Sequence, residues 1–508
     1  MPDKKTRVDW VFLLFLILVT NQAVFSVKLL GIALVYLLRF NLNFGFSEGR
    51  LPKFYQYLIY SSVFTFLIIT REFSPNYIIA YLVGLAFLFF SLLTSHQVKL
   101  SVERYGFEGT YKTIKLFTLL HFLACMYQLG RMMLLTGKAN PYDNTLPFPY
   151  GMSAGDNIFG LFMENSYYNI MVSSLLAVFF LFQRNLFYTL LATSCLILVF
   201  GNFGTIVFAA ILSGLFVSGL FLSLVSTGWI KRYLVPGNFY WIIPFIFGFI
   251  AVLYVNVSPS NYDYVVTKVK DKVFRIKKDD KNNYAALIEN QAPKPEAYDL
   301  ATDNELPEPV LTGNVATGIA ADFTSTNDAK KELTKAYIQS LAGKNLSVFE
   351  TIAYLKSSPQ AFLFGAGVAR FSSVAATKVS GLDSSRLFSV IPNYRSDLYE
   401  QNHYLLVTTR ETIGDDALKS TANWPDSLYN QLLGEYGVIG FGLFVFFYIG
   451  YFLSRYKKLT YGIWLILLLV PFAHLNYTFD TLCVIPFFEL LLFADIKRNE
   501  QTTAENVQ

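Results

Sequence analysis

Long apolar runs alternate with short polar segments along most of the chain. Many of these runs approach the roughly 20 residues that an α-helix needs to cross a bilayer core. The pattern predicts about twelve spans, at residues 10–20, 23–40, 54–70, 77–94, 114–136, 166–182, 185–201, 203–225, 239–256, 427–453, 460–475 and 479–495. The apolar region from Trp10 to Phe40 is too long for one untilted helix, and Asn21 divides it into two short spans. The chain is therefore predicted to be an all-α polytopic membrane protein.

The polar segments divide the chain into three parts. Residues 1–256 contain spans one to nine, residues 257–426 form a large loop, and residues 427–508 contain the last three spans and a tail. The first part of the loop, 258–325, is polar and rich in Pro, Asn and Asp, which is typical of a solvated insertion. Apolar residues at helical spacing then predict two helices, one beginning at Asn327 and one over about 346–356.

The basic residues predict the orientation of the spans. With a cytoplasmic N-terminus, the short outer loops contain just Arg71 and Lys138, whereas the inner segments contain most of the other basic residues near the spans. Lys and Arg favour cytoplasmic loops. Both termini are therefore predicted to be cytoplasmic, and the large loop is predicted to lie outside the cytoplasm.

Composition and charge narrow the class of protein. The chain is 54% hydrophobic and 15% charged, below the roughly 25% charged residues of soluble domains. A net charge of +5 is too small and too dispersed to indicate a nucleic-acid partner. The three cysteines lie in apolar spans and are interpreted as small core residues. Without a nucleotide-binding or zinc motif, neither a cofactor nor a metal site is predicted.

One candidate for chemistry lies in the loop, at residues 359–371. Pro359 is followed by Phe364-Gly365-Ala366-Gly367 and then by Arg370. Glycines allow backbone N–H groups to converge on an anion, and a guanidinium binds phosphate through two hydrogen bonds. The alternative is an ordinary tight turn followed by a surface arginine.

A second candidate lies at the start of the tenth span. Asp426 falls at the outer membrane boundary, where it is suited to cap the helix or to act as a base, and the two roles are compatible. Glu435 lies about two and a half turns deeper. An acid inside a span usually faces the interior of the bundle.

These features together resemble the O-antigen ligase/polymerase superfamily. The resemblance rests on the twelve-span layout, the large outer loop between spans nine and ten, and two short motifs. The first is Pro-x-x-x-Leu-x-Gly-x-Gly from Pro359 to Gly367, and the second is Glu-x-Gly-x-x-Gly from Glu435 to Gly440. The layout covers the whole chain, whereas the likeness in sequence is confined to about 344–371 and 426–445.

The resemblance implies a metal-independent glycosyltransferase without a cofactor. Such enzymes act in the bacterial inner membrane and join lipid-linked glycans at its periplasmic face. The donor is an undecaprenyl diphosphate-linked glycan, and the acceptor is another glycan or the lipid A core of lipopolysaccharide. Chain-length regulators and flippases are the protein partners that this resemblance suggests.

Three departures from the family's pattern matter for the assignment. Ligases of this kind carry His-Asn nine residues before the tenth-span glutamate, where this chain has Asp426-Ser427, and this difference favours a polymerase. Lys344 stands where the family often has an arginine. The family's Ser-Arg-Gly appears here as Asn202-Phe203-Gly204, without the cation.

Transfer from a diphosphate requires positive charge at the leaving group and a positioned base at the acceptor hydroxyl. Asp426 is the first candidate base, His403 is the second, and His474 also lies near the outer face. His121, in the middle of a span, is expected to have a packing role. Arg131 is also suited to extend from its span to the membrane interface. The candidate substrate-binding residues are Arg131, Arg370, Arg395, Arg410, Lys344 and Glu435.

Three other functions were weighed against an O-antigen or exopolysaccharide polymerase. The first is the related ligase, which passes a finished glycan to lipid A core or to protein. The second is a glycosyltransferase that uses a polyprenyl-phosphate sugar; such enzymes typically carry acidic residues in the first outer loop, which is almost absent here. The third is a transporter or flippase, for which paired halves with broken midplane helices are expected.

Overall fold

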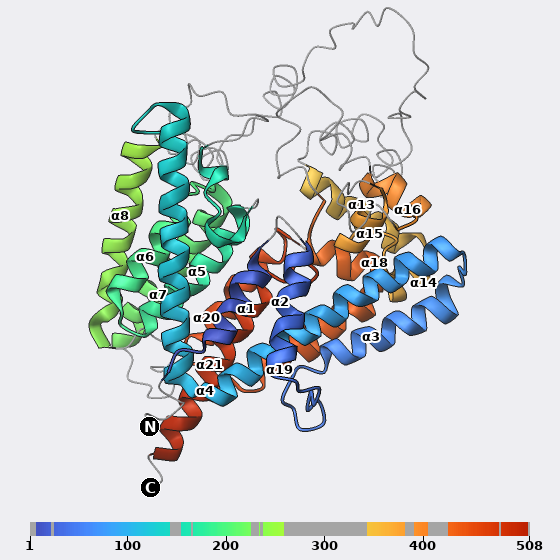
Figure 1. Ribbon diagram of the computed structural model, residues 1–508, viewed down its shortest axis with the longest axis horizontal. Helices are drawn as coiled ribbons and strands as arrows, with labels where there is room; N and C mark the ends of the chain where they lie inside the picture. The colour runs from blue at the N-terminus through green and yellow to red at the C-terminus, as the bar shows by residue number, and fades with distance from the viewer. Residues whose placement is uncertain are drawn as a thin grey trace, which may run out of the picture.

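The computed structural model describes residues 7–21, 25–142, 154–163, 166–224, 233, 237–258, 343–381, 391–404, 425–476 and 479–505. Within these ranges all of the regular secondary structure is helical. The predicted helix from Asn327 and the polar insertion at 258–325 lie outside the described residues. The helices form three neighbouring groups (Figure 1).

The central group contains the first and last helices of the chain. It consists of α1 (Trp10–Thr20), α2 (Phe25–Leu38), α20 (Gly462–Phe472) and α21 (Ile485–Glu505), with the short η13 (Tyr456–Lys458) before α20. Helix α21 is buried at every position from Ile485 to Ile496, so it forms the core of the bundle.

The longest helix, α4 (Pro75–Thr136), connects the other two groups. The sequence predicts two spans here, at 77–94 and 114–136, joined by a cytoplasmic loop. In the structure the joining residues are helical, and the direction changes at Gly106, whose φ is +64°. A positive φ is easily adopted by glycine, which has no Cβ. The change of direction therefore needs one residue rather than a loop.

The second half of α4 lies among the helices of the middle of the chain. These are α5 (Ser166–Phe182), α6 (Leu186–Ile197), α7 (Asn202–Leu224) and α8 (Ile242–Val257), at the left of Figure 1. Three 3₁₀ turns accompany them: η4 (Ala154–Asn157), η5 (Gly160–Phe162) and η7 (Gly237–Trp241).

The first half of α4 lies beside α3 (Phe54–Phe64), which continues into η2 (Thr65–Thr70). Next to them lie α13 (Gly343–Ser357), α14 (Pro359–Phe364), α15 (Val374–Val379), α16 (Asp397–Tyr399), η9 (Glu400–Tyr404) and α18 (Leu428–Leu443), the last continued by η12 (Phe444–Ile449) and α19 (Gly450–Leu453). Helix α13 contains the predicted helix 346–356. Pro359 begins α14 because its missing N–H is not needed in a first turn.

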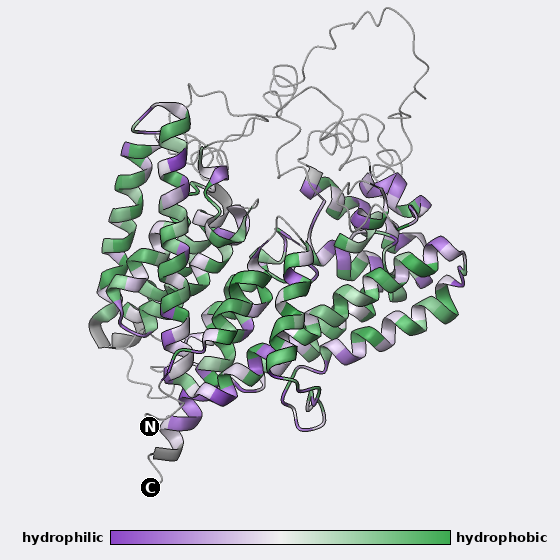
Figure 2. Ribbon diagram, viewed as in Figure 1, coloured by the Kyte–Doolittle hydropathy of each residue, from purple (hydrophilic) through white to green (hydrophobic). Residues whose placement is uncertain are grey.

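Apolar helices dominate the described residues. Three are long and apolar enough to cross a membrane, namely Pro75–Thr136, Phe239–Val257 and Leu428–Leu453. Shorter apolar helices occupy the other predicted spans except the last, 479–495, which α21 overlaps from Ile485. Polar residues are frequent in α13 and α16 and near the end of α21, whereas the helices between are largely apolar (Figure 2). This distribution fits a membrane protein.

Candidate functional site

The two motifs found in the sequence meet in direct backbone contact. Helix α18 is interrupted at Gly437, where φ is +64°. An interrupted helix leaves carbonyl groups without intrahelical donors. The N–H of Ala366 donates to the carbonyl of Gly434 at 2.8 Å, and the N–H of Gly367 donates to that of Glu435 at 3.0 Å. These two amides therefore satisfy α18 and are not available to an anion, contrary to the anion-binding interpretation of this turn.

The contact requires glycine on both sides. A Cβ on Gly365, whose φ is +70°, would lie 2.5 Å from the carbonyl carbon of Glu435. A Cβ on Gly437 would lie 2.4 Å from the carbonyl of Leu363. We call this arrangement, formed by residues 363–367 and 434–437, the glycine crossing.

Glu435 lies at the glycine crossing and faces the interior, as expected for an acid within a span. Its side chain is buried, with 1% of the residue exposed. One carboxylate oxygen, Oε1, accepts a hydrogen bond from the N–H of Phe371 at 3.4 Å. The other, Oε2, has no hydrogen-bond partner among the described residues. An unpartnered buried oxygen is unfavourable, so this position needs an explanation beyond packing.

Arg370 follows the glycine crossing and pairs with an acid that the sequence analysis did not single out. Its guanidinium lies 3.1 Å from Oε2 of Glu72, in the short connection between η2 and α4. The same oxygen accepts a hydrogen bond from the hydroxyl of Tyr394 at 3.0 Å. About a fifth of the Arg370 side chain (22%) is exposed. Arg370 is therefore a reachable cation that is balanced by Glu72 in this structure.

Lys344 and Asp426, two of the predicted site residues, form an ion pair. The ammonium of Lys344 lies 2.7 Å from Oδ1 of Asp426 and also donates to the carbonyls of Asp426 at 2.6 Å and Leu475 at 2.9 Å. An ammonium has three N–H donors, so these contacts use all of them. The helix cap predicted for Asp426 is supplied by Ser427, whose Oγ accepts from the N–H of Tyr429 at 3.3 Å.

A cavity of about 430 Å³ lies between α13 and α18, beside this ion pair. Asn345, which follows Lys344, and His474, which precedes Leu475, both line it. The rest of the lining is mainly apolar or aromatic: Val348, Phe349, Thr351, Ile352, Tyr429, Asn430 and Leu433. Apolar walls with a few polar groups are typical of ligand sites.

His403, the second candidate base, is fully buried. It packs against the ring of Phe371 with centroids 4.7 Å apart, and its Nδ1 lies 3.9 Å from Oε2 of Glu350. Burial lowers the pKa of His403 to about 3 and raises the pKa of Glu350 well above its usual value. Burial thus favours the neutral form of both groups, and His403 has no surface at which an acceptor hydroxyl would meet it.

The remaining predicted arginines are not part of this cluster. Arg131 is exposed on the second half of α4, in the group of α5–α8 and away from α13–α18 (Figure 1). Arg395 is exposed, donates its Nε to the carbonyl of Ser380 at 2.9 Å and lies over the ring of Tyr404. Arg410 lies outside the described residues. The predicted convergence of Arg131, Arg370 and Asp426 on one pocket is therefore not found.

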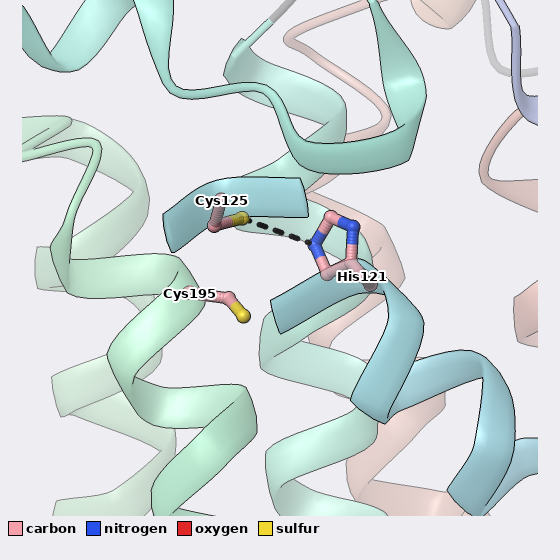
Figure 3. A group of neighbouring side chains, drawn as sticks. All are labelled: His121, Cys125 and Cys195. Atoms are coloured by element: carbon pink, nitrogen blue, oxygen red, sulfur yellow. Dashed lines mark hydrogen bonds between the residues drawn. The ribbon is translucent and has the colours of Figure 1, made fainter. Parts of the chain in front are cut away.

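A second polar cluster lies inside the group of α4–α6 and contains His121, Cys125 and Cys195 (Figure 3). Their potential ligand atoms all lie within 4.8 Å of one another. His121 and Cys125 are four residues apart on α4, which places them on one face of that helix. All three residues are expected from the sequence to be packing groups, and their contact with one another is not predicted.

The hydrogen bonds of His121 decide between metal binding and packing. Its Nδ1 accepts from the N–H of Leu161 at 3.2 Å, so the proton of the neutral ring lies on Nε2, which donates to Oδ1 of Asn169 at 2.9 Å. The amide of Asn169 donates in turn to the carbonyl of Ile158 at 3.0 Å. A metal ion requires a free nitrogen lone pair, and the nitrogen that faces Cys125 carries the proton. The arrangement favours a packing role.

The comparisons with known proteins give no relative from which a function can be transferred. No protein-family model, curated protein or solved structure matches the chain. The resemblance to the O-antigen ligase/polymerase superfamily thus rests on the layout and on the two motifs that form the glycine crossing.

Proposed function

We propose that this chain is an O-antigen polymerase-like glycosyltransferase. In this proposal it joins undecaprenyl diphosphate-linked glycan units at the periplasmic face of the bacterial inner membrane. One observation carries the proposal: the two motifs that resemble the superfamily, far apart in the sequence, interlock at the glycine crossing. Their contact brings the segment that carries Arg370 to Glu435, whose carboxylate accepts from the N–H of the next residue, Phe371.

Arg370 is the group best placed to bind the donor's diphosphate. Negative charge grows on the leaving diphosphate during transfer, and a guanidinium stabilises it through charge-assisted hydrogen bonds. In this structure Glu72 holds the guanidinium. A diphosphate with more negative charge than one carboxylate would compete with Glu72 for Arg370, so this ion pair keeps the cation oriented until the donor binds.

The acceptor would be activated in the cavity between α13 and α18. Its walls combine aromatic rings, which stack on sugar faces, with Asn345 and His474 at the polar end. The Lys344–Asp426 pair fixes the ends of the segments that surround this polar end.

The membrane arrangement is part of the proposal. Twelve spans with both termini in the cytoplasm would place residues 257–426 in the periplasm. The start of α1 and the end of α21 support this arrangement, because both contact the region of α4 around Gly106. Asp9 donates its N–H to Oγ1 of Thr113 at 3.0 Å, and Gln501 accepts from the N–H of Phe107 at 3.4 Å.

The proposal is tested in a producing cell that lacks the protein and is complemented with variants. Arg370→Ala should slow chain extension by about 10²–10³-fold, the usual cost of losing one electrostatic contact to the transition state. Arg131→Ala is the matched control, because Arg131 lies in the other group of helices, and it should leave chain length unchanged. The readout is the glycan on the carrier lipid, with protein levels measured in parallel.

The accumulated species separates the functions. A single repeat unit on the periplasmic side of the membrane supports a polymerase, whereas full-length chains on the carrier would indicate a ligase. A repeat unit trapped on the cytoplasmic side would indicate a flippase. Normal chain lengths in Arg370→Ala at normal protein level would contradict the proposed catalytic site.

A further inference from the structure

His474 lies at the polar end of the cavity between α13 and α18, and it is held there by its backbone. Its own N–H donates to the carbonyl of Pro471 at 3.2 Å. The preceding residue, Ala473, accepts from the N–H of Leu428 at 2.8 Å, at the start of α18. The following residue, Leu475, accepts from Lys344. The imidazole is thus carried by a segment that is fixed on both sides.

Three other polar side chains of the cavity, those of Asn430, Thr351 and Tyr429, are already engaged, whereas the amide of Asn345 has no proton-accepting nitrogen. The amide of Asn430 donates to Oγ of Ser347 at 2.6 Å and to the carbonyl of Pro425 at 3.1 Å, while its oxygen accepts from Thr351. The hydroxyl of Tyr429 donates to the carbonyl of Val470. By contrast, no described side chain hydrogen-bonds the ring nitrogens of His474. The imidazole is therefore the group that remains able to accept a proton from a ligand.

Asp426, the base favoured by the sequence, has a different role in this geometry. Its carboxylate lies 2.7 Å from the ammonium of Lys344 and is held in this ion pair. The same ammonium holds the carbonyl of Leu475, the residue after His474. Asp426 and Lys344 are accordingly positioning residues that fix His474.

We propose that this cavity binds the hydroxyl-bearing sugar of the acceptor glycan, and that His474 is the catalytic base that activates it. The inference rests on the proposed function and deepens it. His474 takes the proton of the acceptor hydroxyl, and the oxygen forms a bond to the anomeric carbon of the donor sugar. The bond between that carbon and the diphosphate oxygen breaks, and its electron pair leaves with the carrier diphosphate. The imidazolium then returns its proton to water or to the departing diphosphate.

The experiment uses the full chain in liposomes, supplied with undecaprenyl diphosphate-linked repeat units. His474→Gln keeps the size and polarity of the side chain but cannot take the proton, and it should lower kcat by about 10²–10⁴-fold with little change in KM for the donor. Added imidazole should restore part of the activity of His474→Gly. Asp426→Asn should lose less activity than His474→Gln and should keep the acid limb of the pH profile, which His474→Gln should lose.

Charged groups near His474 affect the pH at which it titrates. The titratable or charged groups facing His474 are Lys344 on α13, Asp426 before α18 and Tyr429 on α18. Lys344→Met should therefore shift the pH at which activity falls on the acid side. In the double variant with His474→Gln this acid limb should be absent, so no shift should be seen.

The outcomes distinguish this inference from the proposed function. If the wild type extends glycans and folded His474→Gln keeps both its rate and its acid limb, His474 is not the base, while the proposed function stands. If the acid limb disappears in Asp426→Asn instead, Asp426 is the base and the inference is overturned. Failure of the wild type to extend any glycan, together with normal chain lengths in cells lacking it, would overturn both.

Discussion

Two buried histidines on opposite sides of the molecule differ in how their neighbours satisfy them. His121 has a partner for each ring nitrogen, and Asn169 beside it is also fully engaged. His403 has no hydrogen-bond partner for either ring nitrogen among the described residues, and one oxygen of Glu350 and one of Glu435 are in the same state. Buried polar groups without partners cost about 1–3 kcal/mol each. The contrast separates a fully hydrogen-bonded cluster within α4–α6 from an incompletely hydrogen-bonded one around α13–α18, where the proposed site lies.

The largest effect is expected at the glycine crossing, which carries the second cluster. Gly437→Ala would force a Cβ into the carbonyl of Leu363 at a residue with φ of +64°. Because the contact is between two backbones, neither side has a flexible group that can move aside. We expect a loss of about 4 kcal/mol or more of unfolding free energy, measured by thermal or denaturant unfolding in detergent.

Gly442→Ala is the matched control for this change. Gly442 lies in the same helix, α18, but a Cβ there meets nothing within 4 Å. Alanine has a higher helix propensity than glycine, so this variant should be equally or slightly more stable than the wild type, by up to about 1 kcal/mol. Equal destabilisation by the two variants would show that the loss of stability does not come from the backbone contact at Gly437.

Substitution of His121, in the cluster within α4–α6, should lower the stability of the protein and leave its activity unchanged. His121→Ala removes the partner of the Leu161 N–H and of Asn169, and we expect a loss of about 3 kcal/mol in unfolding free energy. The rate of chain extension per folded molecule should remain that of the wild type. A chelator should not change the unfolding temperature of the wild type. A clear drop on chelation would show that the cluster with Cys125 and Cys195 holds a metal ion after all.

The sequence predicted the helices better than it predicted their contacts. Apolar runs located most of the helices because burial in lipid or in a bundle requires apolar residues, and the helix at 346–356 followed from the spacing of its apolar residues. Gly365 and Gly437 belong to the two motifs found in the sequence, but local sequence does not show that one turn docks on the other. Their partners are set by tertiary structure.

The charged residues were harder to predict for a related reason. Lys344 and Asp426 were selected separately as a diphosphate contact and a base, yet they bind each other. Arg370 was recognised, whereas Glu72, its partner from a short connection almost 300 residues earlier, was not. A sequence shows which residues carry charge, but pairing depends on which helix ends meet. The i, i+4 spacing of His121 and Cys125 was the signal that would have suggested their contact.

Substitution of Glu435 tests whether an unpartnered carboxylate in the α13–α18 cluster takes part in the reaction. Glu435→Gln keeps the shape of the side chain and removes its charge. The unpartnered carboxylate oxygen is replaced by an amide nitrogen or an amide oxygen. Since no cation pairs with this carboxylate among the described residues, the folded protein should be as stable as the wild type or more so, by about 1 kcal/mol. If the unpartnered oxygen serves the reaction, chain extension should fall by about tenfold or more. Unchanged extension at equal stability would remove Glu435 from the site.

A further expected effect concerns the pH dependence of stability that the titration of His403 causes. Burial holds its pKa at about 3, below the value of about 6.5 in the unfolded chain, so the unfolded state binds more protons between these values. Stability should therefore fall as the pH is lowered through this range. His403→Phe, which preserves the aromatic contact with Phe371, removes this titration. From pH 6.5 to 5 the wild type should lose about 2 kcal/mol of unfolding free energy relative to His403→Phe.

Glu350 changes the stability with pH in the opposite direction to His403. The effect of His403 is therefore measured as the difference between the wild type and a variant. Its pKa is raised by burial, so the folded state keeps a proton that the unfolded state releases, and the stability it contributes declines as the pH rises above about 4.5. In Glu350→Gln this contribution is absent, and the loss of stability on acidification should become larger than in the wild type. A His403→Phe curve parallel to that of the wild type would show that His403 binds its proton as readily in the folded protein as in the unfolded chain, as it would beside an ionised Glu350. In that case the pair with Glu350, at 3.9 Å, would be ionic, and the cluster would be satisfied like that of His121.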